Sequence, residues 1–155
     1  MAATRSGFST RCSAPGCSTP CAGGRARARA GLPYLGASAG INVACPTIKT
    51  TNDMPIVQPA RFEALGLVPF QINPHYLDPD PESRHMGETR EDRIREFLEE
   101  NDVAVVGLRE GAWLRIEGKD GQVGGAAAAR VFRRGRAPEE LAPGASLESL
   151  LRVGS

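Results

Sequence analysis

A serine flanked by small residues at Gly36-Ala37-Ser38-Ala39-Gly40 is the feature that most constrains how this chain can fold. An apolar run, Leu32 to Leu35, precedes it, and Ile41-Asn42-Val43-Ala44 can open a helix. In a strand-to-helix elbow the glycines avoid collisions that a Cβ would cause, and the serine hydroxyl projects from a strained turn. The helix start directs backbone N–H groups, that of Ala39 first, toward developing negative charge. The pattern predicts such an elbow, with an ordinary turn as the alternative.

Length and composition restrict the remaining possibilities. The chain has 155 residues, of which 41% are hydrophobic, and a net charge of +1. These values favour one domain with a real core over a disordered chain or a nucleic-acid-binding surface. No apolar run approaches the roughly 20 residues that a membrane-spanning helix needs. The first three cysteines fit no usual zinc spacing and have no histidine nearby, so we expect neither a metal site nor a disulfide framework there. The four cysteines are Cys12, Cys17, Cys21 and Cys45.

The charges divide the chain unevenly. Neither Asp nor Glu occurs before Asp53, whereas the first thirty residues carry five of the arginines. Residues 1–30 also lack apolar periodicity, which predicts a disordered or spurious leader, with an organelle transit peptide as the alternative. Residues 31–133 have the pattern of a folded α/β protein. Residues 134–155 are predicted to form a weakly structured tail.

Several elements are predicted within the folded part. Leu67 to Ile72 is apolar enough for a buried strand, which Pro74 ends. Thr89 and Asp92 are spaced as a capping box, and they predict a helix whose core stripe is Ile94, Phe97 and Leu98. The other predictions are a helix over Ala39 to Ala44, a loop over Thr47 to Pro55, a second buried strand over Val103 to Leu108, and an antiparallel edge formed by Trp113 to Ile116 and Arg130 to Phe132.

Three polar residues suggest hydrolytic chemistry. Ser38 lies in the elbow, Asp53 in the loop that follows, and His75 just beyond a strand end. A serine hydroxyl needs a base within hydrogen-bond reach, and the base needs a carboxylate that fixes its tautomer. His75 is better placed for this than His85, which falls in a polar loop. A purely structural His75 at a strand end is the competing interpretation.

A set of longer motifs then resembles one family. The motifs are Gly36 to Gly40, Ala44-Cys-Pro-Thr-Ile-Lys-Thr-Thr-Asn-Asp-Met-Pro-Ile-Val57, Gln71-Ile-Asn-Pro-His75, Gly87-Glu-Thr-Arg90 and Glu110-Gly-Ala-Trp113. In order and approximate spacing they are similar to the dipeptidase E family, aspartyl dipeptidases of serine peptidase family S51. The resemblance runs from about residue 31 to residue 133.

The resemblance implies a fold and an activity. The fold would be part of a three-layer α/β/α architecture, flavodoxin-like and akin to class I glutamine amidotransferases. The activity would be cytoplasmic hydrolysis of Asp-X dipeptides through an acyl-enzyme, without metal or cofactor, nucleic acid or membrane. Ser38 matches the nucleophile, His75 the base and Asp53 the orienting acid, with Glu110 as the alternative acid. Ala39 would supply an oxyanion N–H, and Arg90 would bind the substrate's aspartyl carboxylate, for which a guanidinium is well suited.

The chain also departs from the family pattern. Nothing in residues 1–30 resembles the family's upstream half, so the similarity covers the carboxyl-terminal half only. Without those strands an apolar sheet edge would be exposed, which favours self-association. Two alternatives to an active dipeptidase therefore stay open. One is a catalytically inactive remnant that is inert or binds a complementary half, and the other is a cyanophycinase-like peptidase.

Overall fold

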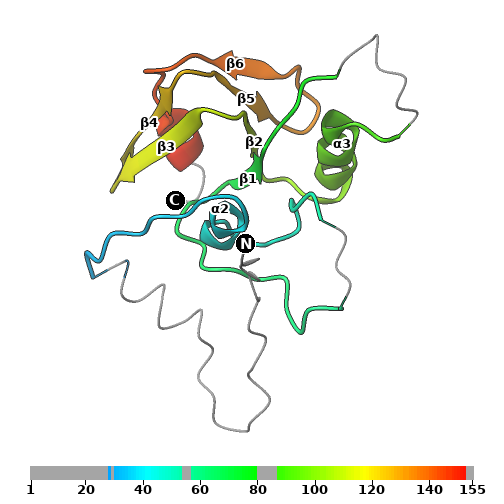
Figure 1. The fold of residues 1–155 in the computed structure, drawn as a ribbon, viewed down its shortest axis with the longest axis horizontal. Coiled ribbons are helices and arrows are strands. Elements are labelled where there is room, and N and C mark those ends of the chain that lie inside the picture. The colour runs from blue at the N-terminus through cyan, green and yellow to red at the C-terminus, as the bar shows by residue number, and fades with distance from the viewer. Residues whose placement is uncertain (1–27, 29, 54–56, 80–86, 153–155) are drawn as a thin grey trace, which may run out of the picture.

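The computed structural model describes residues 28, 30–53, 57–79 and 87–152, which form a mixed α/β structure (Figure 1). In chain order the elements are α2 (Ala39–Ala44), β1 (Gln71–Pro74), α3 (Arg90–Glu100), β2 (Val105–Leu108), β3 (Ala112–Glu117), β4 (Asp120–Gly125), β5 (Ala129–Phe132), β6 (Glu139–Leu141) and α4 (Glu148–Leu151). No helix in these ranges has the length and apolar character needed to cross a membrane. The expected leader, apart from residues 28 and 30, lies outside the described residues, as do Cys12, Cys17, Cys21 and His85.

One mixed sheet organises the fold. Its strand order is β1-β2-β5-β6, with β1 parallel to β2 and the other two pairings antiparallel. Both β1 and β2 are buried along their whole length, which is typical of parallel strands covered on two faces. A two-stranded hairpin of β3 and β4 forms a separate sheet. The parallel pair matters for the site because it brings the carboxyl ends of β1 and β2 to the same edge.

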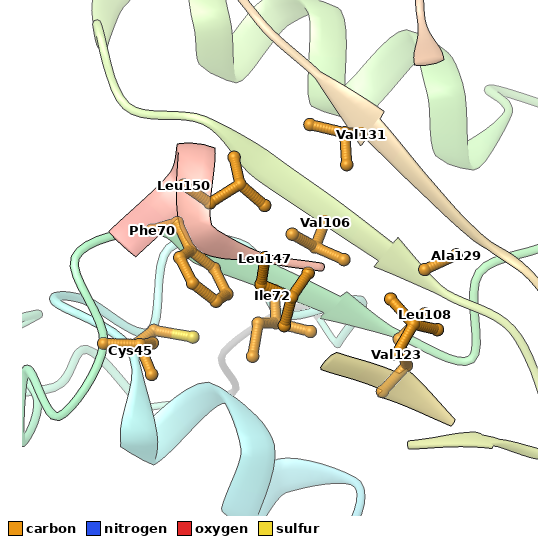
Figure 2. Close-up of a cluster of buried hydrophobic side chains, with 11 residues drawn as sticks. Cys45, Phe70, Ile72, Val106, Leu108, Val123, Ala129, Val131, Leu147 and Leu150 are labelled. Atoms are coloured by element: carbon orange, nitrogen blue, oxygen red, sulfur yellow. The ribbon is translucent and has the colours of Figure 1, made fainter. Parts of the chain in front are cut away.

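The register of the sheet sorts its side chains onto two faces. Ile72, Val106 and Val131 are neighbours across three strands and share one face. Figure 2 shows these side chains in one apolar cluster with Cys45 after α2 and side chains of β4 and α4. The buried residues of this cluster are Cys45, Val68, Phe70, Ile72, Val106, Leu108, Val123, Ala129, Val131, Leu147 and Leu150.

Helix α3 covers the other face of the sheet. Its Ile94 and Leu98 pack with Val105 and Phe132, while Phe97 is only partly buried. The capping box is present in full, because the Thr89 hydroxyl accepts from the Asp92 amide and the Asp92 carboxylate accepts from the Thr89 amide. The predicted start and core stripe of this helix are therefore confirmed.

Polar side chains cover the outer edge of β1. Thr50 Oγ1 donates to the Ile72 carbonyl at 2.9 Å, and Asn52 Nδ2 donates to the Pro74 carbonyl at 2.7 Å. In the other direction, Asn73 Nδ2 donates a hydrogen bond to the Thr50 carbonyl at 3.0 Å. The loop predicted over Thr47 to Pro55 thus satisfies backbone groups that a neighbouring strand would otherwise pair.

Four predictions differ from the structure. Trp113 to Ile116 and Arg130 to Phe132 do not form one antiparallel edge, because β3 pairs with β4 whereas β5 pairs with β2 and β6. Leu32 to Leu35 forms no strand, because its backbone pairs with none of the described residues. The strand predicted from Leu67 begins only at Gln71, since the amides of residues 65–68 donate to carbonyls at the end of α2 instead. The segment 134–152 is ordered rather than weakly structured. It contains β6 and α4, and Leu147 and Leu150 are fully buried.

Candidate functional site

The serine elbow has the strained geometry that its sequence predicts. Ser38 has a φ of 51°, a left-handed value that is uncommon outside glycine, and it occupies the N-cap position of α2 without a side-chain capping bond. The turn is closed by the Gly40 amide on the Ala37 carbonyl and the Ile41 amide on the Ser38 carbonyl, both at 2.9 Å. Tyr34 Oη donates to the Gly40 carbonyl at 2.6 Å. These bonds hold the exposed Ser38 side chain at the helix start.

The two glycines of the elbow are not equivalent. A Cβ on Gly36 would lie 2.8 Å from the Gly40 carbonyl oxygen, whereas a Cβ on Gly40 would meet only Tyr34 Oη at 3.8 Å. We expect Gly36→Ala to lower the free energy of unfolding by about 1–3 kcal/mol, the usual cost of overpacking. Gly40→Ala is the matched control, and it should be neutral or slightly stabilising because it lies within a helix. Urea unfolding of the two variants tests this, and equal losses would contradict the close approach of Gly36 to Gly40.

His75 follows directly on β1. Pro74 is the last residue of that strand, and His75 turns away from it with a φ of 55°, again left-handed. The next residue rejoins the sheet, because the Tyr76 amide donates to the Leu108 carbonyl of β2 at 3.0 Å. Local strain at an ordered, hydrogen-bonded position of this kind is a feature of functional sites.

The imidazole of His75 connects a hydroxyl and a carboxylate. Its Nε2 lies 2.9 Å from Ser38 Oγ, and its Nδ1 contacts Glu110 Oε1. Glu110 comes two residues after β2, whose Leu108 is the register partner of Pro74. If Nδ1 carries the proton, His75 donates to the Glu110 carboxylate and Nε2 accepts from the serine hydroxyl. This arrangement is suited to removing a proton from Ser38 during nucleophilic attack.

The three side chains are open to solvent. The His75 and Glu110 side chains are 48% and 74% exposed, and Ser38 is exposed as well. An exposed contact of this kind contributes little to folding stability. Its consequence is geometric, since it orients the imidazole toward Ser38.

The two candidate acids, Glu110 and Asp53, differ in their contacts. Glu110 contacts His75, whereas the Asp53 side chain forms no hydrogen bond with any described residue and is exposed. The loop that carries Asp53 passes the end of β1, where Asn52 donates to the Pro74 carbonyl. Although this loop passes close to the end of β1, the Asp53 carboxylate forms no hydrogen bond with the His75 imidazole.

Two other predicted site residues start helices. Ala39 is the first residue of α2 and follows Ser38 directly, so its amide has no acceptor within the helix. Arg90 is the first residue of α3, is half-buried, and makes no hydrogen bond or ion pair within the described ranges. The structure does not bring Arg90 into contact with Ser38, His75 or Glu110. The roles of both residues remain predictions.

Sequence reasoning missed an arginine that connects the elements carrying the site. Arg109 precedes Glu110, and its guanidinium donates to both oxygens of Asp78 at 2.7 and 2.8 Å and of Glu140 at 2.8 and 2.9 Å. It also lies 5.5 Å from the centre of the Tyr76 ring. This side chain thus joins the segment after His75 to the end of β2 and to β6. The only indication of this role in the sequence is that Arg109 directly precedes Glu110.

The Asp78–Arg109 pair predicts a pH dependence of stability. Hydrogen bonds from Arg109 hold the pKa of Asp78 below its ordinary value. The pair therefore stabilises the fold above about pH 4, the pKa of an unfolded aspartate, and loses this contribution as the pH falls through the lowered folded pKa. Because 47% of the Asp78 side chain is exposed, solvent screening limits the effect to about 1 kcal/mol.

We expect Asp78→Asn to be less stable than the parent at pH 7, with the difference shrinking toward pH 3. Urea unfolding at pH 7, 5 and 3 measures it. Asp102→Asn is the control, since Asp102 is exposed and has no ion pair among the described residues. A constant difference between Asp78→Asn and the parent across this pH range would contradict the role of the ionised carboxylate.

Cys45 is excluded as the nucleophile. Its side chain is fully buried, and burial raises the pKa of the thiol to about 12. At neutral pH it is therefore a protonated packing residue, in accord with the sequence interpretation. No group of three or more metal-ligating side chains gathers within the described part of the chain.

The amino-acid sequence of this chain is similar to those of known proteins. A family model described as "Peptidase family S51" matches residues 25–124. Over 125 residues the chain is 70% identical to "Peptidase E" of Streptomyces coelicolor, a match that covers 81% of this chain and 51% of the relative. Over 122 residues it is 53% identical to "Probable alpha-aspartyl dipeptidase" of Drosophila melanogaster, covering 79% and 51%. A "Peptidase E" of Nostoc sp. is 50% identical over 126 residues, covering 81% and 52%.

These matches also show how much of each relative the chain covers. The chain spans about half the length of the curated relatives it matches. This agrees with the carboxyl-terminal half to which the sequence motifs point. The matched region includes Ser38, His75 and Glu110.

Proposed function

Because the chain belongs to peptidase family S51, we propose that it is a serine peptidase that hydrolyses dipeptides with an N-terminal aspartate. The observation that carries the proposal is the 2.9 Å contact between Ser38 Oγ and His75 Nε2, with Glu110 on the other ring nitrogen. The names of the relatives, peptidase E and alpha-aspartyl dipeptidase, support the substrate class. The complete fold is proposed to be a flavodoxin-like three-layer α/β/α structure, and the enzyme to act in the cytoplasm without metal or cofactor.

The proposed reaction has two stages. Ser38 Oγ attacks the carbonyl carbon of the Asp-X peptide bond while His75 Nε2 accepts the hydroxyl proton, and the Ala39 amide stabilises the oxyanion. His75 then gives the proton to the leaving amine, and the C–N bond breaks to leave an aspartyl ester on Ser38. Water, deprotonated by His75, hydrolyses the ester and releases aspartate. In this scheme Glu110, rather than Asp53, orients the imidazole.

Substrate preference provides the direct test of this proposal. The purified chain should hydrolyse Asp-Leu and leave Ala-Leu and an aspartate–arginine polymer largely intact. Preferential cleavage of the polymer would favour a cyanophycinase-like activity instead. Absence of turnover with every substrate would overturn the proposal and favour the inactive remnant, to which the solvent-exposed site also lends support.

Arg90 should account for the preference for aspartate. A guanidinium bonded to the substrate's side-chain carboxylate contributes about 1.5–3 kcal/mol, so Arg90→Gln should lower kcat/KM for Asp-Leu by roughly 10–100-fold. Hydrolysis of Ala-Leu, which lacks that carboxylate, should be unaffected. Arg115→Gln is the matched control, because Arg115 is an arginine of β3 that pairs with Glu117. Equal losses on both substrates would contradict a role in recognising aspartate.

A further inference from the structure

The contact between His75 and Glu110 depends on how the two segments that carry these residues are held. Both side chains are largely open to water, and an exposed contact does little to fix the groups that make it. Each residue lies just beyond a strand end, since the last register pair of β1 and β2 is Pro74 with Leu108. The geometry of imidazole and carboxylate is therefore set by whatever joins these two segments beyond the sheet.

The segment after β2 is a tight turn that begins at Arg109. The Ala112 amide donates to the Arg109 carbonyl at 3.1 Å, so Glu110 and Gly111 are the central residues of the turn. Gly111 has a φ of 80°, the left-handed value that the third residue of a type II turn needs. Fixing Arg109 thus fixes the turn on which Glu110 lies.

Arg109 uses every N–H group of its side chain to hold this position. A guanidinium has five N–H donors in a fixed planar arrangement. Two of them bond to the two carboxylate oxygens of Asp78, two to those of Glu140, and the last to the Ala128 carbonyl at 3.0 Å. The side chain is only 20% exposed. With all of its donors engaged, the guanidinium is confined to one orientation.

The partners of Arg109 belong to the segment that carries His75 and to the sheet. Asp78 lies three residues after His75. The fully buried Tyr76 directly follows His75, and the centre of its ring is 5.5 Å from the guanidinium. Glu140 belongs to β6, the outer strand of the sheet (Figure 1). Arg109 therefore joins the segment after β1 to the turn after β2 and anchors both on β6.

We propose that Arg109 is a positioning residue for the hydrolytic reaction, because it sets the turn that carries Glu110 against the segment that carries His75. This role rests on the proposed function, in which Glu110 orients the imidazole. The hydrogen bonds of the guanidinium all go to other residues, so Arg109 acts through Glu110 and not on the substrate.

Three variants distinguish this role from that of a charge alone. Arg109→Gln removes both paired sets of bonds, while Arg130 still contacts the same two carboxylates at 3.1 and 3.5 Å, so the variant is expected to fold. Arg109→Lys keeps the charge but is a point donor that cannot bond both oxygens of two carboxylates, and it should recover only part of the activity. Arg133→Gln is the matched control, because Arg133 is 25% exposed and pairs with Glu139, also of β6.

A double-mutant cycle with Glu110→Gln separates positioning from a general loss of stability. In the parent, Arg109→Gln should lower kcat for Asp-Leu by roughly 10–10²-fold, the scale of a small misplacement, with KM little changed. In the Glu110→Gln background the same change should cost less than about threefold, because the group that Arg109 positions is already impaired. Equal losses in the two backgrounds would overturn the proposal, since a merely structural residue acts alike in both.

The tautomer of His75 provides a second measurement, which does not require turnover. Long-range proton–nitrogen NMR spectra of the chain with isotope-labelled histidine are recorded at a pH where the imidazole is neutral. The parent should carry the ring proton on Nδ1, because Glu110 accepts it. Arg109→Gln should shift the population toward the Nε2–H form, whereas Arg133→Gln should leave it unchanged. Loss of the signals in His75→Ala assigns them.

The outcomes of the two measurements are separable. An unchanged tautomer in Arg109→Gln would overturn the role of Arg109 even where the parent hydrolyses Asp-Leu, and full activity in Arg109→Lys would do the same. A tautomer shift in a chain that hydrolyses no substrate would support this role while contradicting the proposed activity. A parent without the proton on Nδ1 would contradict both. Circular dichroism verifies folding, and Asp78→Asn, which cuts the same link, replaces Arg109→Gln in both measurements if that variant does not fold.

Discussion

Replacing Ser38 with alanine is expected to reduce hydrolysis of Asp-Leu to the background rate, a fall in kcat of roughly 10⁴–10⁶-fold. The physical reason is that the variant lacks the oxygen that His75 Nε2 contacts at 2.9 Å, so no acyl-enzyme can form. Water would have to attack the peptide carbonyl directly, with help only from the remaining site. Steady-state kinetics of the parent and the variant under identical conditions measure the ratio.

The control for this prediction is a serine outside the site. Ser146→Ala serves, because Ser146 lies near α4 and its hydroxyl accepts a bond from the Glu148 amide. That variant should retain the kcat of the parent. Unchanged turnover in Ser38→Ala would exclude Ser38 as the nucleophile, whatever its contacts.

The second large effect is expected at Glu110. Glu110→Gln keeps the shape of the side chain but offers an amide that can stabilise the wrong imidazole tautomer, which costs about 10⁴-fold where the acid is buried. Glu110 is 74% exposed, and solvent partly replaces its charge, so we expect a smaller loss of about 10²–10³-fold in kcat. The KM for Asp-Leu should change little, because Glu110 is not proposed to contact the substrate.

Asp53→Asn is the matched comparison, since it makes the same chemical change at the other candidate acid. Asp53 makes no side-chain bond within the described residues, so its substitution should alter kcat by no more than about twofold, the usual size of a surface effect. The reverse order, with a large loss in Asp53→Asn and a small one in Glu110→Gln, would restore Asp53 as the orienting acid. Measuring kcat for both variants in parallel decides between them.

Elements that depend on local signals could be predicted from the sequence. The helix over Ala39 to Ala44 was predicted with the bounds that the structure gives it, because the glycine-rich elbow starts it and Pro46 follows its end. The start of α3 was predicted because Thr89 and Asp92 exchange hydrogen bonds over three residues. The mixed α/β class and membership of family S51 are likewise confirmed.

Elements that depend on distant partners could not be predicted in the same way. Leu32 to Leu35 has the apolar composition of a strand, but a strand exists only where another backbone pairs with it. The tail was expected to be weakly structured, yet Leu147 and Leu150 enter the core because the Leu147 amide reaches the Gly121 carbonyl of β4. Sequence periodicity over so short a segment does not reveal that packing.

In the candidate site, too, some features follow from local sequence and others depend on distant partners. The sequence indicates Ser38 and His75 because one lies in an elbow and the other follows a strand, and the structure brings these two side chains together. The preference for Asp53 over Glu110 rested on the family resemblance and on chain order. The register that pairs Pro74 with Leu108 places His75 and Glu110 at one edge, and this information is not present in the spacing of the residues.

The central claim is that His75 activates Ser38, and covalent labelling by a fluorophosphonate tests it most directly. Such a reagent reacts with an activated serine, and peptide mass spectrometry identifies the residue that carries the phosphonyl group. The account predicts a single adduct on Ser38 that forms at least about 10²-fold more slowly in His75→Ala, the scale of general-base assistance. Failure of Ser38 to react in the folded chain, or an equal labelling rate in His75→Ala, would contradict it.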